Sequence, residues 1–216
     1  MNYVDRLQTV IHKGCHCAKD IGDEWQTPEE EFKGIVRLFG PFSIDLFASH
    51  FNRKYSYYFT AKENALKQDW MAYCSSKGLE CRGFANPPYS KPHVGLMTDG
   101  STCTGLGEIV DKARQECEKG FYSVMVVPHS PEADWFGDAL KKATDIWTVI
   151  GGRITFEPPK WYTQDPQGSK PSSARGGTSI FVFNPLTKGR THAIHSWIQR
   201  DYLRQLGQEL DHDLLH

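Results

Sequence analysis

The sequence has no long apolar run. No stretch of its 216 residues approaches the roughly 18 consecutive apolar residues of a membrane-spanning helix. The N-terminal segment also lacks an apolar core of the length found in secretory signal peptides. These absences predict a protein of the cytosol, of a cell or of an infected cell, with no membrane partner.

A net charge is also missing. Lys and Arg number 25 and Asp and Glu number 26, so the formal charge is −1. This balance excludes a polybasic protein that holds nucleic acid by bulk charge alone, but it does not exclude a local basic face. The charges are spread unevenly: residues 1–31 contain three Lys or Arg and seven Asp or Glu, whereas residues 152–190 contain six and two. The basic C-terminal third suits an anionic partner.

A cysteine pattern typical of a disulfide-bonded protein is missing as well. The six cysteines are scattered along the chain, which argues against a disulfide framework in a cytosolic protein. Cys15-His16-Cys17 resembles half of a metal site, but zinc sites usually need a second, properly spaced pair, and the sequence has none. We therefore expect no metal. There is also no internal repeat, no phosphate-cradling glycine loop and no convincing Ser-His-Asp order.

Strand and helix patterns alternate along the chain. Thr27 and Pro28 suit the start of a helix, and the apolar run at 121–127 is typical of a strand buried on both faces. The patterns predict helices at 28–39, 106–120, 130–143 and 191–210, and strands at 42–46, 55–60, 83–85, 121–127, 145–156 and 179–184. The inward face of the last helix would be formed by Ile194, Trp197, Ile198 and Tyr202. The alternation favours an α/β fold with a mostly parallel sheet.

One domain accounts for most of the chain. We expect an N-terminal extension at 1–22, the domain at 23–185 and a C-terminal helix at 186–216. The stretches 90–105 and 157–178 are longer than usual connections. Both follow a strand and would lie at the carboxyl edge of the sheet, where open α/β sheets bind ligands. Long loops there are more often functional than spare; the alternative is a surface excursion or disorder.

The sharpest motif is Asn86-Pro87-Pro88-Tyr89, directly after a strand. Its two prolines end the strand and stiffen the turn that leaves it. The loop then presents an amide oxygen, a backbone carbonyl and an aromatic ring, which suit an exocyclic amine on a planar ring. Accepting both amine protons makes the nitrogen more nucleophilic, and fixed acceptors stabilise the positive charge that develops on it. The motif predicts methylation of such an amine; the alternative is a loop that only ends the strand.

The chain resembles class I S-adenosyl-L-methionine-dependent methyltransferases, and more closely the phage Dam-like DNA N6-adenine methyltransferases. The resemblance covers about residues 24–184 and rests on an ordered series: Trp25-Gln26-Thr27-Pro28, Asp45-Leu46-Phe47-Ala48 with Asn52, Asn64-Ala65-Leu66 with Trp70, Asn86-Pro87-Pro88-Tyr89-Ser90, Pro128, Asp134-Trp135-Phe136, and Gly152-Arg153-Ile154 with Phe156. The motif at 86–89 alone is shared with RNA and protein-glutamine methyltransferases, but the series is more specific. It implies a Rossmann-like sheet with an antiparallel last strand and helices on both faces.

The resemblance also implies roles for individual residues. The catalytic set Asn86, Pro87, Pro88 and Tyr89 would hold an adenine flipped out of double-stranded DNA. Asp45 would face the methionine or ribose part of S-adenosyl-L-methionine, and Asn64 or Asp69 its adenine or ribose. The implied cofactor set is Trp25, Thr27, Pro28, Asp45, Phe47, Ala48, Asn64, Asp69 and Asn86. Many class I enzymes have Gly-x-Gly after the first strand. This chain has none, as in the family it resembles, which leaves a degenerate cofactor site open.

The expected DNA contacts lie in the long loops and the turn after 145–150. Bases and aromatics alternate in the second loop, which suits phosphate contact together with stacking or insertion. The candidates are Ser90, Lys91, Arg153, Lys160, Trp161, Lys170 and Arg175. A solvated loop is the alternative for the second loop, and a structural salt bridge is the alternative for Arg153.

The sequence therefore predicts a site-specific DNA adenine-N6 methyltransferase that acts by direct displacement, located in the bacterial host cytoplasm if a phage encodes it. Two alternatives stay open. One keeps the enzyme class but changes the acceptor to RNA or a protein glutamine amide. The other is a catalytically inactive DNA-binding protein on the same scaffold. The DNA target sequence and the oligomeric state do not follow from the sequence.

Overall fold

The structure is a computed structural model that describes residues 25–89, 105–158, 172–173 and 176–214. Among these residues no helix has the length and apolar character needed to cross a bilayer. Several predictions fall outside the described residues: the N-terminal extension with its Cys-His-Cys triplet, and the proposed DNA contacts Ser90, Lys91, Lys160, Trp161, Lys170 and Arg175.

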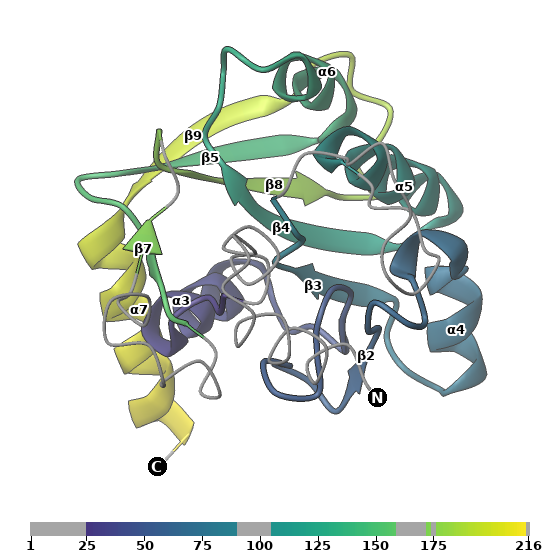
Figure 1. Cartoon of the computed structure of the whole chain (residues 1–216), viewed down its shortest axis with the longest axis horizontal. Helices are drawn as coiled ribbons and strands as arrows, with labels where there is room; N and C mark the ends of the chain where they lie inside the picture. The colour runs from purple at the N-terminus through teal and green to yellow at the C-terminus, as the bar shows by residue number, and fades with distance from the viewer. Residues whose placement is uncertain (1–24, 90–104, 159–171, 174–175, 215–216) are drawn as a thin grey trace, which may run out of the picture.

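Seven strands form one sheet in the order β2-β1-β3-β4-β8-β5-β9 (Figure 1). Their bounds are β1 Ile44–Asp45, β2 Tyr57–Tyr58, β3 Arg82–Ala85, β4 Tyr122–Pro128, β5 Asp145–Ile150, β8 Thr178–Phe183 and β9 Ile194–Gln199. Neighbouring strands pair in parallel except at β8, which runs antiparallel to both β4 and β5. The prediction of a mixed α/β fold with a mostly parallel sheet is confirmed. The antiparallel strand, however, is not the last one, because β9 follows it.

Helices cover both faces of the sheet (Figure 1). α4 (Trp70–Ser76), α5 (Leu106–Lys119) and α6 (Asp134–Lys142) enclose one apolar cluster, and α3 (Glu29–Phe39) and α7 (Arg200–Leu214) enclose the other. β4 lies between the two clusters and contributes Met125 and Val127 to the first and Val124 and Val126 to the second. Burial on both faces explains the unbroken apolar run in its sequence.

The start of α3 differs from the predicted one. Pro28, not Thr27, is the N-cap, and the helix begins at Glu29. Its acidic first turn lies at the positive end of the helix dipole. Thr27 is instead buried at 1% exposure, and its hydroxyl has no hydrogen-bond partner among the described residues.

The strand predicted at 145–156 is too long. β5 ends at Ile150, because Gly151 and Gly152 have φ angles of 74° and 152° and turn the chain away from the sheet. The continuation is β6 (Thr155–Phe156), which pairs with β7 (Ser172–Ser173) in a separate two-stranded ladder. The predicted strands at 42–46 and 55–60 are likewise reduced to the two-residue β1 and β2.

The helix predicted at 191–210 is wrong in its first part. That part is β9, which adds in parallel to the open edge of β5, and α7 begins only at Arg200. Ile194, Trp197 and Tyr202, predicted to face inward, are 47%, 63% and 52% exposed, whereas Ile198 is buried. The apolar spacing fits either a helix or a strand, but only a strand can satisfy the unpaired backbone at the edge of β5.

The packing of α3 against α7 depends on two glycines. A Cβ at Gly207 would overlap the carbonyl oxygen of Glu30, and one at Gly34 would overlap that of Leu203. The two helix backbones therefore approach more closely than larger side chains permit. The C-terminal helix is in this way part of the layer that covers the sheet.

Gly207→Ala should lower the free energy of unfolding. Overpacking costs about 1–3 kcal/mol, and the gain of roughly 1 kcal/mol in helix propensity offsets only part of it. Gly137→Ala in α6 is the matched control, because a Cβ there meets no atom within 4 Å; it should be neutral or slightly stabilising. Urea denaturation of both variants measures the difference. Equal stability of the two variants would contradict the close helix contact.

Candidate functional site

Three neighbouring parallel strands run toward the carboxyl edge of the sheet, where β1 and β3 end and β4 continues to Pro128. In the pairing register, Asp45 of β1 lies opposite Phe84 of β3, and Ala85 lies opposite Met125 of β4. The motif at 86–89 leaves the central strand of the three. The residues that follow β1 therefore lie on one side of the motif, and those that follow β4 lie on the other.

The Asn86 side chain has a fixed orientation. Its Nδ2 donates a hydrogen bond to the backbone carbonyl of Trp25 at 2.9 Å. Its Oδ1 accepts a hydrogen bond from the Tyr89 hydroxyl at 2.9 Å. Because the amide nitrogen is held by a carbonyl, the two ends of the amide cannot exchange without losing both contacts. The amide oxygen, which has two lone pairs, therefore keeps a defined direction.

Tyr89 folds the motif back onto the sheet. Its hydroxyl lies 3.1 Å from the carbonyl oxygen of Val126 in β4, in addition to its contact with Asn86. Its ring meets the ring of Phe156 edge to face, with centroids 5.8 Å apart. Pro87 is buried, and Pro88 and Tyr89 are half-buried. The loop is thus fastened at both ends by the side chains of Asn86 and Tyr89.

Asp45 is a buried carboxyl at the end of β1. It is 3% exposed, and its oxygens accept hydrogen bonds from the backbone N–H of Lys54 at 3.0 Å and of Phe47 at 3.4 Å. Burial raises the pKa of the Asp45 carboxyl to about 7, against the smaller lowering effect of those two backbone groups. No cationic side chain pairs with it among the described residues. Such a carboxyl is suited to a ligand that brings a positive charge.

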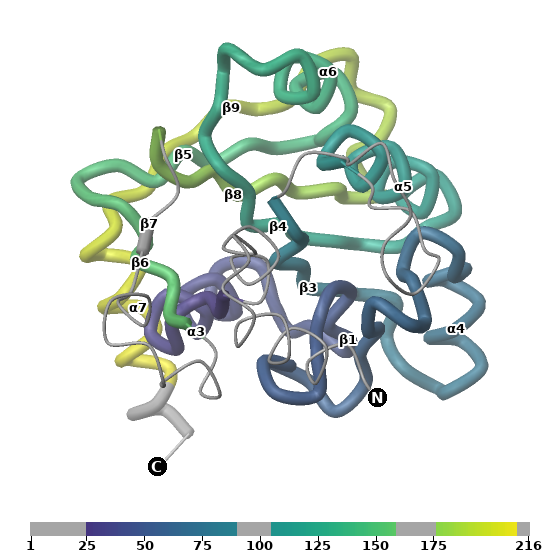
Figure 2. Tube along the Cα trace, viewed as in Figure 1, coloured from purple at the N-terminus to yellow at the C-terminus, as the bar shows by residue number. Residues whose placement is uncertain are grey.

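Thr27 lies on the segment that leads into α3. Its buried hydroxyl has no hydrogen-bond partner in the described part of the chain, which is unusual for a buried polar group. The preceding residue, Gln26, exchanges two backbone hydrogen bonds with Glu157, of 2.8 and 2.9 Å. This bridge fastens the segment to the chain just after β6 (Figure 2).

Phe47 and Ala48 follow Asp45 and are both half-buried. The Phe47 ring meets Trp70 of α4 edge to face, with centroids 6.4 Å apart. The backbone N–H of Ala48 donates to the carbonyl of Phe59 at 2.9 Å. The stretch after β1 is therefore held against the neighbouring strand and helix without the glycines of a Gly-x-Gly loop.

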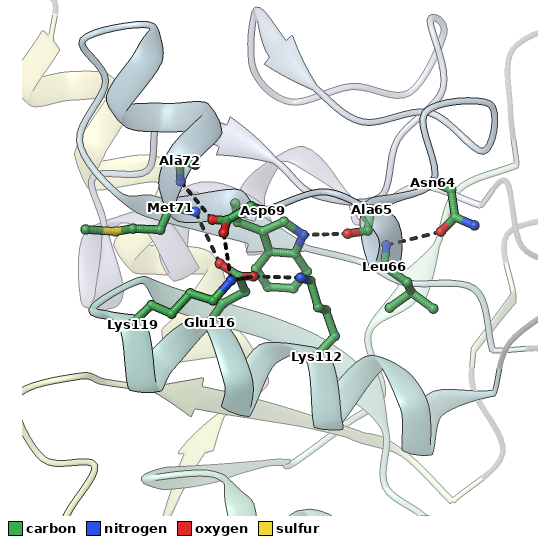
Figure 3. Close-up of polar contacts among 10 residues, drawn as sticks. Asn64, Ala65, Leu66, Asp69, Met71, Ala72, Lys112, Glu116 and Lys119 are labelled. Carbon is green, nitrogen blue, oxygen red and sulfur yellow. Dashed lines mark hydrogen bonds and ion pairs between the residues drawn. The ribbon is translucent and has the colours of Figure 1, made fainter.

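Asn64 and Asp69 lie at opposite ends of a short segment (Figure 3). Asn64 has a positive φ of 56° and caps the 3-10 helix η1 (Ala65–Lys67), with its Oδ1 accepting from the Leu66 N–H at 3.1 Å. The Trp70 indole donates to the Ala65 carbonyl at 2.7 Å and fixes this turn on α4. Neither η1 nor α4 was predicted from the sequence.

Asp69 caps α4 and faces α5 instead. Its carboxylate accepts from the Ala72 N–H at 2.9 Å and pairs with Lys119 at 2.8 Å, and these contacts lower its pKa. Lys119 also pairs with Glu116, a fully buried carboxylate that accepts from the Met71 N–H and from Lys112 (Figure 3). The structure therefore uses Asp69 to join α4 to α5.

The structure also places residues that the sequence did not single out. His129, directly after β4, lies with its Nδ1 2.8 Å from the Ser179 hydroxyl. Thr178 pairs with Pro128 across the β4–β8 ladder, and its buried hydroxyl has no partner among the described residues. His129 could have been identified as a candidate from the sequence, because it directly follows a buried strand at the carboxyl edge. Its partner on an antiparallel strand could not be read from the sequence.

Arg153 lies in the exposed turn between β5 and β6. It forms no ion pair within the described residues, so the structural salt bridge that was its alternative is not found there. In the same part of the chain, no group of three His, Cys, Asp or Glu lies close enough together to hold a metal ion.

Comparison with known proteins identifies the class of this chain. The family model described as DNA N-6-adenine-methyltransferase (Dam) matches residues 14–210, and the chain therefore belongs to the Dam family. An Escherichia coli (strain K12) protein named "Putative methyltransferase YfdM" is 44% identical over 89 residues, which are 40% of this chain and 93% of that protein. The resemblance drawn from the sequence motifs is confirmed. The match also extends beyond 24–184 and includes β9 and most of α7. The chain is an enzyme of a methyltransferase family.

Proposed function

We propose that the protein transfers a methyl group from S-adenosyl-L-methionine to N6 of an adenine that is flipped out of double-stranded DNA, on a Rossmann-like class I fold. The observation that carries this proposal is the Asn86 amide. It lies at the carboxyl end of a central strand and is oriented by the Trp25 carbonyl, so that its oxygen is the group left to accept an amine proton. Membership of the Dam family supports DNA as the substrate.

The motif at 86–89 would act by positioning. Asn86 Oδ1 and the Pro87 carbonyl accept the two N6 protons of adenine, and the Pro87-Pro88 turn keeps these acceptors in place. Acceptors that are already oriented stabilise the positive charge on N6 without reorganising as the reaction proceeds. The half-buried Tyr89 ring supplies the stacking surface for the base and shields the site from water.

The residues around the end of β1 fit the cofactor. Thr27 has a buried hydroxyl without a partner among the described residues, and Asp45 has a buried carboxyl. The ammonium group in the methionine part of the cofactor would be a suitable partner for either side chain. When bound, S-adenosyl-L-methionine supplies the electrophilic methyl group. Trp25, Pro28, Phe47 and Ala48 would line the same site, and Asn64 would hold the adenosine end. Asp69 would have to leave Lys119 to reach the cofactor, so we assign this role to Asn64.

The DNA would lie across the carboxyl edge of the sheet. Arg153 is exposed at that edge and free of ion pairs within the described residues, which suits a phosphate contact. We propose that Ser90, Lys91, Lys160, Trp161, Lys170 and Arg175 make further contacts from the two long loops. A DNA-directed reaction is also the basis for proposing the cytoplasm as its location.

Transfer of a tritiated methyl group to DNA, RNA and protein in parallel tests the proposed function. Label is expected in DNA, as N6-methyladenine, and methylation-sensitive sequencing of DNA from expressing cells would then give the target sequence. Label in RNA or protein instead would identify the alternative acceptors. No label, together with no cofactor binding by calorimetry, would identify an inactive DNA-binding protein.

A comparison of two Tyr89 variants separates the ring from the hydroxyl. Tyr89→Phe loses one hydrogen bond of about 1 kcal/mol, so kcat/KM should fall roughly 5-fold. Tyr89→Ala also loses base stacking of about 1–3 kcal/mol, which should lower kcat/KM a further 5- to 100-fold. Steady-state kinetics on DNA measures both variants, with melting temperatures to check folding. If Tyr89→Phe were as damaging as Tyr89→Ala, the ring would not be the stacking surface.

A further inference from the structure

The segment that joins β1 to β2 and the turn beyond has an unusual composition. Residues 46–62 contain no Asp or Glu. They contain three bases and six aromatic residues, namely Arg53, Lys54 and Lys62, and Phe47, Phe51, Tyr55, Tyr57, Tyr58 and Phe59. Interleaved bases and aromatics are typical of surfaces that contact nucleic acid. Unlike the long loop after β6, this segment is fully described by the structure.

Arg53 is held rigidly within this segment. Its Nη1 donates to the His50 carbonyl at 3.0 Å and lies 3.4 Å from the Tyr58 hydroxyl. Its guanidinium also lies over the Tyr58 ring, 5.1 Å from the centroid. The Tyr58 hydroxyl is in turn 2.6 Å from His50 Nδ1. The three side chains form a small platform, which we call the Arg53 platform.

The charge of Arg53 is not neutralised. Its contacts are to neutral oxygens and a ring, and within the described ranges it has no ion pair with a carboxylate. The neighbouring Lys54 differs, because it pairs with Glu29 at 2.8 Å. The Nε and Nη2 groups of Arg53 make no hydrogen bond within the described residues. An exposed guanidinium with free donors and a fixed plane is suited to a phosphate.

Phe51 lies close to the platform in sequence and is 54% exposed. A large aromatic side chain on a loop tip gains nothing from this exposure in the free protein. Two positions before an unneutralised arginine in the sequence, it provides an apolar surface for a base or sugar. The segment thus combines the two kinds of contact that bind a nucleic-acid strand, one to the phosphate and one to the ring system.

The platform and the motif at 86–89 share one edge of the sheet. Tyr58 ends β2, and β2 is separated from β3 only by β1. At the usual strand spacing, the backbones of β2 and β3 are roughly 10 Å apart. The Arg53 platform lies on the β1–β2 side of the motif. β6 follows β5, which lies on the other side of the motif in the sheet. The described edge therefore offers a contact on the β1–β2 side of the motif.

We propose that the Arg53 platform and Phe51 form a second DNA-binding surface, in which Arg53 binds a backbone phosphate and Phe51 packs against the nucleotide beside it. This inference rests on the proposed function, because it takes double-stranded DNA as the partner. The same guanidinium chemistry would also suit the carboxylate of the cofactor, so the experiment compares the two anions.

Salt-dependent binding of a mixed-sequence duplex to the full chain tests the surface. Arg53→Gln should reduce the slope of log affinity against log salt by about 0.9, the value of one phosphate contact, and weaken binding at low salt. Phe51→Ala should weaken binding about 5-fold or more with the slope unchanged. Lys77→Gln is the control, because Lys77 caps the C-terminus of α4 at the opposite edge and has no ion pair within the described residues. It should change neither quantity.

Two further measurements decide between the anions. Calorimetry should give the same cofactor affinity for Arg53→Gln and the wild type. Phenylglyoxal labelling of the wild type, read by peptide mass, should show Arg53 protected by DNA and not by cofactor, and this holds even if Arg53→Gln fails to fold. An unchanged salt slope, or protection by cofactor alone, would overturn the inference.

The outcomes also separate this inference from the proposed function. If the wild type binds DNA with an Arg53-dependent slope but transfers no methyl group to adenine, the proposed function fails and the surface stands. If the wild type methylates adenine but Arg53 contributes nothing, only the surface fails. If the wild type binds no duplex DNA, both fail.

Discussion

Replacing Asn86 with alanine should lower the rate of methyl transfer by about 100- to 1,000-fold, the usual cost of losing one fixed polar contact to a charge that develops in the transition state. The variant loses the amide oxygen that we assign to the N6 amine. It also leaves the Trp25 carbonyl without its donor. Single-turnover transfer to DNA measures the effect on chemistry separately from product release. Because the change lies at a half-buried loop position, the fold should be retained.

Asn86→Asp is the matched variant. It keeps an acceptor oxygen toward the amine but places a second oxygen against the Trp25 carbonyl, where the amide nitrogen donates in the wild type. We expect activity between those of the wild type and Asn86→Ala. Calorimetry should show cofactor affinity within a few-fold of wild type for both variants. Full activity of Asn86→Ala with normal folding would show that the acceptor is elsewhere.

The second large effect is expected at Asp45. The folded protein has a pKa of about 7 for this carboxyl, against an ordinary value of 3.8. The folded state therefore holds the proton more tightly than the unfolded state, and the free energy of unfolding should fall as pH rises from about 4 to 7. At 1.36 kcal/mol per pKa unit, the decrease from this group is at most about 4 kcal/mol. Asp45→Asn should remove this part of the pH dependence and be more stable than the wild type at pH 8.

Cofactor binding should change in the opposite direction. The ionised carboxylate is the form that pairs with an ammonium group, so wild-type affinity should rise as pH increases through about 7. Asp45→Asn should bind the cofactor at least about 10-fold more weakly, a loss typical of a charge-assisted contact, and without that rise. Asp69→Asn is the control carboxylate and should keep normal affinity. Urea denaturation and calorimetry across pH measure the two effects. Equal affinity of Asp45→Asn and wild type would exclude Asp45 from the site.

The sequence predicts best those elements whose apolar pattern fits only one type of secondary structure. The short apolar run at 121–127 favours a strand buried on both faces. Ile109, Val110, Ala113 and Cys117 share one buried face when the segment is a helix. The pattern of the segment Ile194–Gln199 fits both a helix and a strand. The segment forms a strand because it pairs with the open edge of β5. Sequence spacing contains no information about that edge.

In the candidate site, too, some features follow from the local sequence and others depend on contacts with distant parts of the chain. The position of Asn86 after a strand follows from local sequence, because prolines end strands and the strand pattern precedes it. The partner that orients it, the Trp25 carbonyl, is a backbone atom 61 positions away in the sequence and has no side-chain signature. Similarly, Asn64 and Asp69 are equivalent candidates in the sequence. Only the contact of Asp69 with Lys119 on α5 distinguishes them.

The bridge between Gln26 and Glu157 joins two parts of the proposed enzyme that are otherwise far apart in the chain. One residue before Gln26 is the carbonyl that holds the amide of Asn86, and directly beyond Glu157 begins the loop proposed to meet DNA. The two backbone hydrogen bonds between Gln26 and Glu157 connect these two parts directly. A change in the position of Glu157 would therefore be transmitted through these two hydrogen bonds to the carbonyl that aligns the Asn86 amide.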